Sequence, residues 1–264
     1  MFAKYYCAFA LGKEQDPELA RAFKNIVGLK AEVAYPVLLE LYADFSAGDL
    51  SKPEFLEVLN LVESYIFRRH VCAIPTNSMN KTFATFGKQI DKAAYLESIK
   101  AQFALMSSYK RFPTDQEFVK QAKVRDMYNG RSKHYWLTRL ENFGRKEVVN
   151  TDEYTIEHIM PQNENLSDEW KKDLGEDWQR VQSENLHTLG NLTLTGYNSE
   201  YSDKPFKDKR DMAGGFKESP LALNKGLAEV EVWNEQAIDR RGACLLYTSP
   251  SPRDQRGSRM PSSA

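Results

Sequence analysis

The sequence predicts a mainly helical protein with a small α+β part toward its C-terminal end. Up to about residue 145, apolar residues recur at the three- and four-residue spacing of helix faces. From about residue 150 onward, short β-prone segments alternate with polar stretches. We therefore expect a helical region over residues 1–148 and an α+β domain over residues 149–243.

The composition is that of a soluble globular protein. Of 264 residues, 41% are hydrophobic and 28% are charged, which is ordinary for this class. No apolar run approaches the roughly 20 residues of a membrane span, and the first residues lack the features of a signal peptide. Three scattered cysteines without a C-x-x-C pair exclude a cysteine zinc knuckle and fit a reducing compartment (Cys7, Cys72 and Cys244). We expect a cytoplasmic protein, and the sequence indicates no oligomeric state.

The clearest helix runs from Pro53 to Cys72. Ser51 with Glu54 three residues later has the pattern of a capping box, and Pro53 suits the first turn. One apolar face follows at helical spacing, formed by Phe55, Leu56, Leu59, Val62, Ile66 and Phe67. Further helices are expected over residues 92–106, 114–124 and 134–142.

The second part has a different pattern. Strands are expected around residues 154–156 and 192–195, separated by a loop and short helix that carry Trp170 and Trp178. The pair Gly214 and Gly215 interrupts the following segment. A last helix is expected over about residues 227–240, containing Trp233 and Ile238.

The final residues, 244–264, have another composition. They are rich in Ser, Pro and Arg and lack periodicity, which predicts disorder. The string also resembles the translation of a sequencing adapter, so we expect a non-native tail that starts near Cys244 and exclude it from the fold.

Charge is distributed unevenly. Residues 1–150 carry 22 Lys and Arg against 17 Asp and Glu, whereas residues 151–243 carry 11 against 19. Residues 100–146 alone hold 11 basic and 4 acidic side chains. This pattern fits a solvated helix face, or a surface for phosphates if nucleic acid is the partner.

The first candidate motif is YTIEHIMP at residues 154–161. Glu157 and His158 lie side by side at the end of an expected strand. Hydrolysis of a phosphodiester requires a base that deprotonates water and, in metal-dependent enzymes, an oxygen ligand for the cation. The two residues can supply both, although adjacent strand residues point to opposite faces unless a bulge or strand end intervenes. The alternative is a surface glutamate beside a structural histidine.

The second motif is LHTLGNLTLT at residues 186–195. The amide of Asn191 can orient the imidazole of His158, and Asn198 can be a metal ligand or a helix cap. His187 is either a supporting group of the site or a core histidine. Taken alone, each asparagine has the context of a turn residue or cap.

Together these motifs resemble the ββα-metal, or HNH, nuclease finger. More narrowly they resemble the C-terminal domain of the DUF262/DUF1524 proteins, relatives of the GmrSD-type modification-dependent restriction systems. The matching segments include 157–162 and 186–194, and the likeness extends upstream. Other matching positions are Asn198, Phe206, Lys209, Trp233, Ile238 and Arg240, with segments 65–69, 111–115 and 140–142.

The resemblance implies a role for each matching residue. His158 is the general base and Asn191 orients it. Glu157 and Asn198 bind a divalent cation, Mg²⁺ or Mn²⁺, and Lys209 contacts phosphate. Glutamate replaces the aspartate of many HNH sites, and the bracing cysteine knuckle is absent.

The function implied is DNA cleavage in restriction or phage defence. Full-length relatives carry an N-terminal DUF262 domain linked to nucleotide hydrolysis, and we expect this chain to lack it, since no phosphate-cradling glycine loop is present. Two alternatives remain open. One is a catalytically inactive module that binds nucleic acid or a partner, favoured by the acidic balance of residues 151–243. The other is a ribonuclease.

Overall fold

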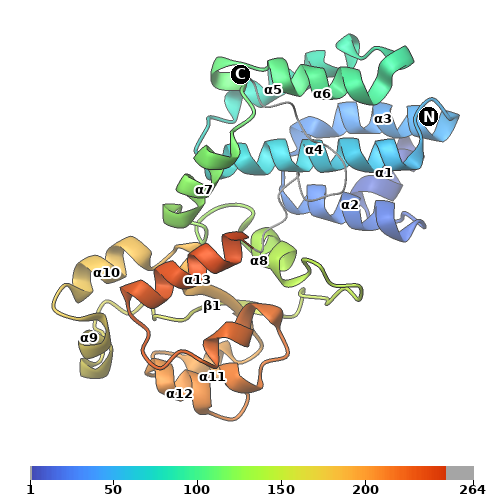
Figure 1. Ribbon diagram of the computed structural model, residues 1–264. Helices are drawn as coiled ribbons and strands as arrows, with labels where there is room; N and C mark the ends of the chain where they lie inside the picture. Colours follow the sequence, from blue (N-terminus) through green and yellow to red (C-terminus); the bar gives the residue numbers. More distant parts are fainter. Residues whose placement is uncertain (1, 248–264) are drawn as a thin grey trace. The chain divides into compact units, whose positions relative to one another are not determined.

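The computed structural model describes residues 2–247. They form two compact units that divide between Phe118 and Val119, and helices predominate in both (Figure 1). Within residues 2–247 the sheet has two strands. Among the described residues, no helix is both long and apolar enough to cross a membrane. The expected fold class, mainly helical with a small β part, is confirmed.

The first unit is built from helices. α4 packs against α2, α3 and α6, and its predicted face is buried at Phe55, Leu59, Val62 and Ile66. The helices and their bounds are α1 (Ala3–Ala10), α2 (Pro17–Gly28), α3 (Tyr35–Ala47), α4 (Lys52–Val71), α5 (Asn77–Phe86) and α6 (Tyr95–Leu105), and α7 (Asp115–Val124) begins in this unit.

The helix starts follow the expected chemistry. Ser51 and Glu54 form both bonds of the capping box at the start of α4. The Thr114 hydroxyl accepts from the Glu117 amide at 3.2 Å at the start of α7. The helix expected over residues 92–106 is split into a 3₁₀ turn, Lys92–Ala94, and α6.

The second unit contains the two strands. β1 (Thr155–His158) pairs antiparallel with β2 (Leu192–Thr195), and Glu157 lies opposite Thr193. The helices of this unit are α8 (Lys133–Glu141), α9 (Asp168–Leu174), α10 (Trp178–Asn185), α11 (Asn198–Tyr201), α12 (Phe206–Asp211) and α13 (Glu235–Tyr247), with 3₁₀ turns η5 (Leu189–Asn191), η6 (Phe216–Glu218) and η7 (Ala222–Leu227).

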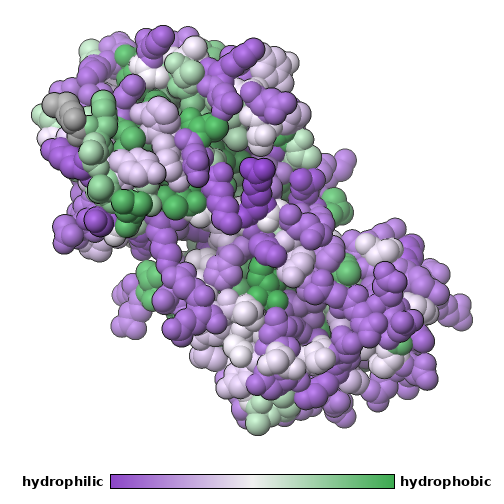
Figure 2. Space-filling view, turned by 180° about the vertical axis from the view of Figure 1, so that it is seen from behind, coloured by the Kyte–Doolittle hydropathy of each residue, from purple (hydrophilic) through white to green (hydrophobic). Residues whose placement is uncertain are grey.

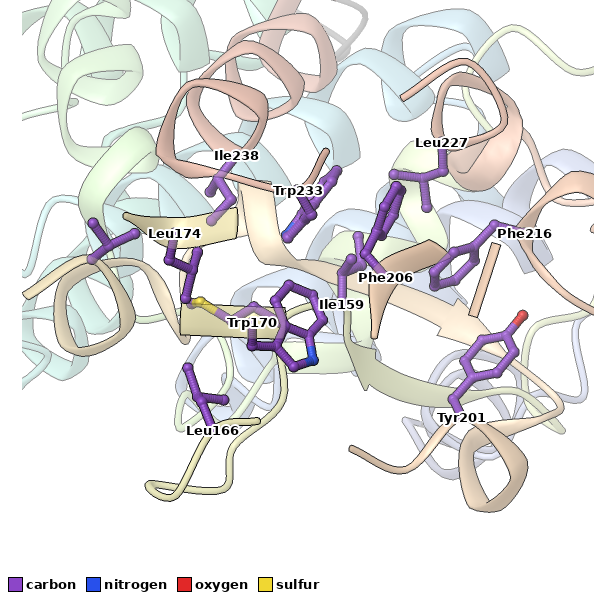
Figure 3. Packing of buried hydrophobic residues seen from close by; sticks show 12 residues of the cluster. Ile159, Leu166, Trp170, Leu174, Tyr201, Phe206, Phe216, Leu227, Trp233 and Ile238 are labelled. Atoms are coloured by element: carbon purple, nitrogen blue, oxygen red, sulfur yellow. The ribbon is translucent and has the colours of Figure 1, made fainter. Parts of the chain in front are cut away.

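An aromatic core lies beside the strands (Figure 3). Trp233 stacks on Phe206, with ring centroids 5.1 Å apart. The Trp170 indole donates to the Lys204 carbonyl at 3.2 Å, so its one polar atom is satisfied within the core. The core therefore joins α9 and α12 to Ile159, the residue that follows β1.

Helix α8 belongs to the second unit. It packs against η7, and the buried Glu141 carboxylate accepts from the amides of Ala222 and Leu223, each at 3.0 Å. The two units thus divide at Phe118, whereas the sequence placed the domain boundary near residue 148. The reason is long-range: the bonds of Glu141 join segments that are far apart in the chain.

The last helix differs from its expected bounds. It starts at Glu235 rather than near residue 227, so Trp233 precedes it. It also continues to Tyr247, with Leu246 buried. The disorder expected from Cys244 onward is therefore wrong for residues 244–247, which continue α13 and include the buried Leu246. The rest of the expected tail, 248–264, lies outside the described residues.

Helix α13 holds the turn that leads into β2. The Arg241 guanidinium donates to the carbonyls of Leu189, Gly190 and Leu192 at 3.2, 2.8 and 2.8 Å. A Cβ at Gly190 would lie 2.3 Å from the Ile238 carbonyl oxygen. The absence of a side chain at Gly190 therefore allows α13 to approach the turn closely.

Hydrophilic residues predominate on the face of the molecule in Figure 2, and apolar residues form small patches among them. Exposed large apolar side chains occur in both units, among them Leu105 and Val124. Scattered residues of this kind are normal on soluble domains. They identify no docking surface.

Candidate active site

The end of β1 presents two buried polar side chains. Glu157 is 3% exposed and His158 is 4% exposed. The strand keeps regular pairing to its end, with His158 opposite Leu192. Because successive residues of a strand point to opposite faces, the two side chains occupy different environments.

The imidazole of His158 lies in an aromatic cage. Its Nε2 forms a 3.0 Å hydrogen bond with Nδ1 of His187. The Tyr128 ring packs edge-on against His158, with centroids 4.4 Å apart, and stacks on His187 at 5.3 Å. The Met127 amide donates to the His187 carbonyl at 2.9 Å, which fixes the Tyr128 loop to this site.

This environment keeps His158 neutral. Burial, with the neighbouring His187 and then Lys209 and Lys133, lowers the pKa of His158 from 6.5 to about 3. At neutral pH the ring is therefore unprotonated, the form that a general base requires. The bond to His187 uses Nε2, so Nδ1 is the ring nitrogen of His158 that this bond leaves over.

Glu157 lies in an ion pair on the other face of β1. The Lys209 ammonium contacts Glu157 Oε1 at 2.6 Å and donates to the carbonyls of His158 and Ile159 at 3.2 and 3.1 Å. Burial raises the pKa of Glu157 to about 7, and Lys209 opposes this rise. Burial also lowers the pKa of Lys209, which Glu157 partly offsets. The structure thus directs the Lys209 ammonium into the protein rather than toward a phosphate.

Asn191 holds backbone and Trp233 together. Its Oδ1 accepts from the Met160 amide at 2.8 Å and from the Trp233 indole at 3.2 Å. Its Nδ2 donates to the carbonyls of Met160 and Leu186 at 3.1 and 3.0 Å. These four bonds use the amide's capacity. The bond to the His158 imidazole expected of Asn191 is made instead by His187.

Asn198 connects a helix to the first strand. It is the first residue of α11 and is exposed. Its Nδ2 donates to the Ile156 carbonyl at 3.2 Å, so the helix after β2 is anchored on β1. The residue therefore lies beside the strand that carries His158.

The side chains do not gather as a cation site in this arrangement. Glu157 Oε1 binds Lys209, and the glutamate and His158 face opposite sides of β1. Residues 2–247 contain no group of three or more His, Cys, Asp or Glu side chains placed to hold a metal ion. The ligand pair Glu157 and Asn198 implied by resemblance therefore does not fit a cation as these residues stand.

Three residues near the site were not identified from the sequence motifs. Tyr128 and Lys133 come from the segment before the motifs, and Lys133 Nζ lies 4.1 Å from the centre of the Tyr128 ring. Arg241 comes from α13. The basic balance of residues 100–146 was the one signal that pointed toward the first two. Nothing local in the sequence distinguishes Arg241 from its neighbour Arg240.

Comparison with known families adds a finding to this geometry. The family model described as GmrSD restriction endonucleases, C-terminal domain, matches residues 112–247. No curated protein matches the chain. The match covers about half of the 264 residues. It includes both strands, α13, and His158 with its ring neighbours Tyr128 and His187. The chain therefore belongs to the family of GmrSD restriction endonucleases through their C-terminal domain.

Proposed function

We propose that the second unit is a DNA endonuclease of the HNH type, in which His158 activates the water that attacks a phosphodiester. Family membership supports a nuclease. The single observation that carries the type is the order of elements around His158. β1 ends at the histidine, β2 pairs with it, and α11 follows directly and is bonded back to β1 through Asn198.

The proposed reaction is hydrolysis at phosphorus. His158 takes a proton from water through Nδ1, and the resulting hydroxide oxygen forms a bond to phosphorus. The bond between phosphorus and the leaving deoxyribose oxygen breaks, and that oxygen takes a proton from a solvent water molecule. The neutral state of His158 supports its role as base.

His187 is the positioning residue in this proposal. Its hydrogen bond to Nε2 holds the ring orientation of His158. In the proposed tautomer, His158 Nε2–H donates to His187 Nδ1, which leaves Nδ1 of His158 unprotonated. Tyr128 restricts access, because its ring lies against an imidazole that is 4% exposed. Binding of substrate is therefore expected to displace Tyr128 from His158.

We expect cleavage to require Mg²⁺ or Mn²⁺, as the resemblance implies. A rotated Glu157 would have to exchange Lys209 for the cation, since the present contact occupies Oε1. Chelation tests this expectation independently of His158. If cleavage continued in EDTA, the metal requirement would be wrong, and the proposed role of His158 would be unaffected.

The experiment is cleavage of supercoiled plasmid by the full chain with Mg²⁺ or Mn²⁺. The full chain is needed because α13 runs to Tyr247. His158→Ala is compared with His134→Ala, a matched histidine of the same unit whose ring bonds to the Tyr154 carbonyl. Loss of a base is expected to slow cleavage by about 10²–10⁴-fold.

The comparison separates two outcomes. Loss of cleavage in His158→Ala with retention in His134→Ala supports the proposal. Parental cleavage by His158→Ala, or no cleavage of any DNA by the parent protein, contradicts it. Unchanged thermal unfolding of both variants serves as the folding control.

A further inference from the structure

A positively charged side chain near His158 would bind the phosphate that is cleaved. Lys209 does not offer this charge, because its ammonium is buried in an ion pair. We propose that Lys133, at the start of α8, binds the phosphodiester that is presented to His158. The inference deepens the proposed function and rests on it. It assigns to Lys133 the phosphate contact that the resemblance gave to Lys209.

Two ring contacts connect Lys133 with the base. Its Nζ lies 4.1 Å from the centroid of the Tyr128 ring. That ring in turn lies 4.4 Å from the His158 ring, measured between centroids. The ammonium is therefore one aromatic ring away from the imidazole, on the side of β1 that His158 faces.

The loop that carries Tyr128 has defined geometry. The Asn129 amide donates to Asp126 Oδ1 at 2.9 Å, and its side chain donates to Oδ2 at 2.8 Å. The Met127 amide is bonded to the His187 carbonyl. These three bonds tie the loop to itself and to His187. The Lys133 amide donates to the Gly130 carbonyl at 3.3 Å, so Lys133 follows directly from this loop.

The ammonium of Lys133 is available to an anion. The side chain is exposed, and among the residues that the structure describes no carboxylate lies within ion-pair distance of its Nζ. Its neighbour is the face of an aromatic ring, a contact of about 0.5–1 kcal/mol at an exposed position. Exchange of this weak contact for a charged phosphate oxygen is favourable.

The charge of the surrounding chain favours the same segment. Residues 119–148 carry 8 Lys and Arg against 3 Asp and Glu, whereas residues 151–243 carry 11 against 19. Both segments belong to one compact unit. The acidic part repels DNA, so the cations that attract the backbone come from the segment that contains Lys133.

The test measures binding of the full chain to a fluorescein-labelled DNA duplex in EDTA, so that cleavage does not interfere. One lost phosphate contact is expected to reduce the slope of log K against log salt by about 0.9, and to weaken binding roughly tenfold at about 0.1 M salt. Lys133→Gln should show both effects. Lys133→Arg should retain binding because the charge is kept.

Lys172→Gln is the matched control. It removes the same charge from an exposed position of the second unit, on α9. Equal loss of binding in both glutamine variants would mean that bulk charge alone acts, and would overturn the proposal. So would parental affinity and salt slope in Lys133→Gln.

The two proposals fail in different ways. If the parent protein cleaves DNA and Lys133→Gln binds DNA normally, the Lys133 assignment is wrong and the nuclease stands. If the parent protein binds no DNA and cleaves none, both fail. If the parent protein cleaves DNA and Lys133→Gln binds DNA weakly while Lys172→Gln binds normally, both proposals are supported.

Discussion

Lys209 places its ammonium 2.6 Å from the carboxylate of Glu157, where the two side chains are 0% and 4% exposed. The same ammonium binds the carbonyls of His158 and Ile159. One buried cation therefore satisfies a carboxylate and two backbone oxygens at the end of β1. This contact holds the orientation of Glu157 and the path of the chain after His158.

We expect Lys209→Met to destabilise the second unit strongly. The substitution leaves a buried carboxylate and two carbonyls without their donor, and loss of one partner of a buried pair costs about 3–5 kcal/mol. Urea unfolding measures the change. The double variant Glu157→Gln with Lys209→Met should recover part of the loss, because the orphaned charge is removed. Stability equal to the parent in Lys209→Met would show that the pair is unimportant.

We expect Asn191→Ala to destabilise the protein more than Asn198→Ala. Asn191 is fully buried and makes four side-chain hydrogen bonds, and each buried group left unsatisfied costs about 1–3 kcal/mol. Asn198 is exposed, and its side chain donates to the Ile156 carbonyl, a bond whose loss costs about 1 kcal/mol. Thermal unfolding of the two variants compares them. Equal melting temperatures of the two variants would contradict the larger structural role of Asn191.

The sequence predicted the elements that depend on local chemistry. The Ser51 capping box, the α7 start at Thr114 and both strands have residue patterns that suffice within a few positions. The expected start of the last helix was wrong because Leu227 and Trp233 both pack into the core without belonging to that helix: Leu227 ends η7, and Trp233 lies before α13. An apolar residue pattern predicts burial, but it does not by itself predict a helix.

The sequence predicted that the candidate residues lie near one another, but it did not predict their contacts. Glu157, His158 and Asn191 do lie together around one strand pair. Which nitrogen or carboxylate bonds to which partner depends on Tyr128, His187 and Lys209, whose positions follow from tertiary packing. The pairing of Asn191 with Trp233 links residues 42 positions apart, beyond the reach of any local motif.

Stability should depend on pH through His158. Its pKa is about 3 in the folded protein and 6.5 without the fold, so the unfolded chain binds the proton first. The contribution of neutral His158 to the free energy of unfolding is therefore fully present above pH 6.5. It decreases as the pH falls from 6.5 toward 3, by about 1.4 kcal/mol per pH unit for one proton. Urea unfolding in EDTA of the parent and His158→Gln measures it. Parallel pH dependences of the two proteins would contradict this prediction.

His187→Ala should lower the rate of cleavage at saturating DNA and leave affinity unchanged. The substitution removes the hydrogen bond that orients His158, and we expect a loss of about 10–100-fold, by analogy with residues that orient a ligand. His187→Asn retains a polar atom near the position of Nδ1 and should restore part of the rate. Single-turnover cleavage gives the rate, and anisotropy gives the affinity. A parental rate in His187→Ala would exclude a positioning role.

Gly190→Ala should destabilise the protein, whereas Gly196→Ala should have little effect. A Cβ at Gly190 would meet the Ile238 carbonyl oxygen at 2.3 Å, but a Cβ at Gly196 has no neighbour within 4 Å. Forced overpacking costs about 1–3 kcal/mol. Differential scanning calorimetry detects the resulting fall in melting temperature. Equal melting temperatures of the two variants would mean that α13 does not pack closely against the turn at Gly190.

The hold of Arg241 on the turn before β2 has a consequence for biosynthesis. The guanidinium that satisfies the Leu189, Gly190 and Leu192 carbonyls is translated long after them. At about 5–20 residues per second, a nascent chain on the ribosome carries the histidine pair for several seconds before α13 exists to support it. The nuclease unit should therefore mature only once its last helix has emerged, and a message cut short upstream of Arg241 should yield an inert product.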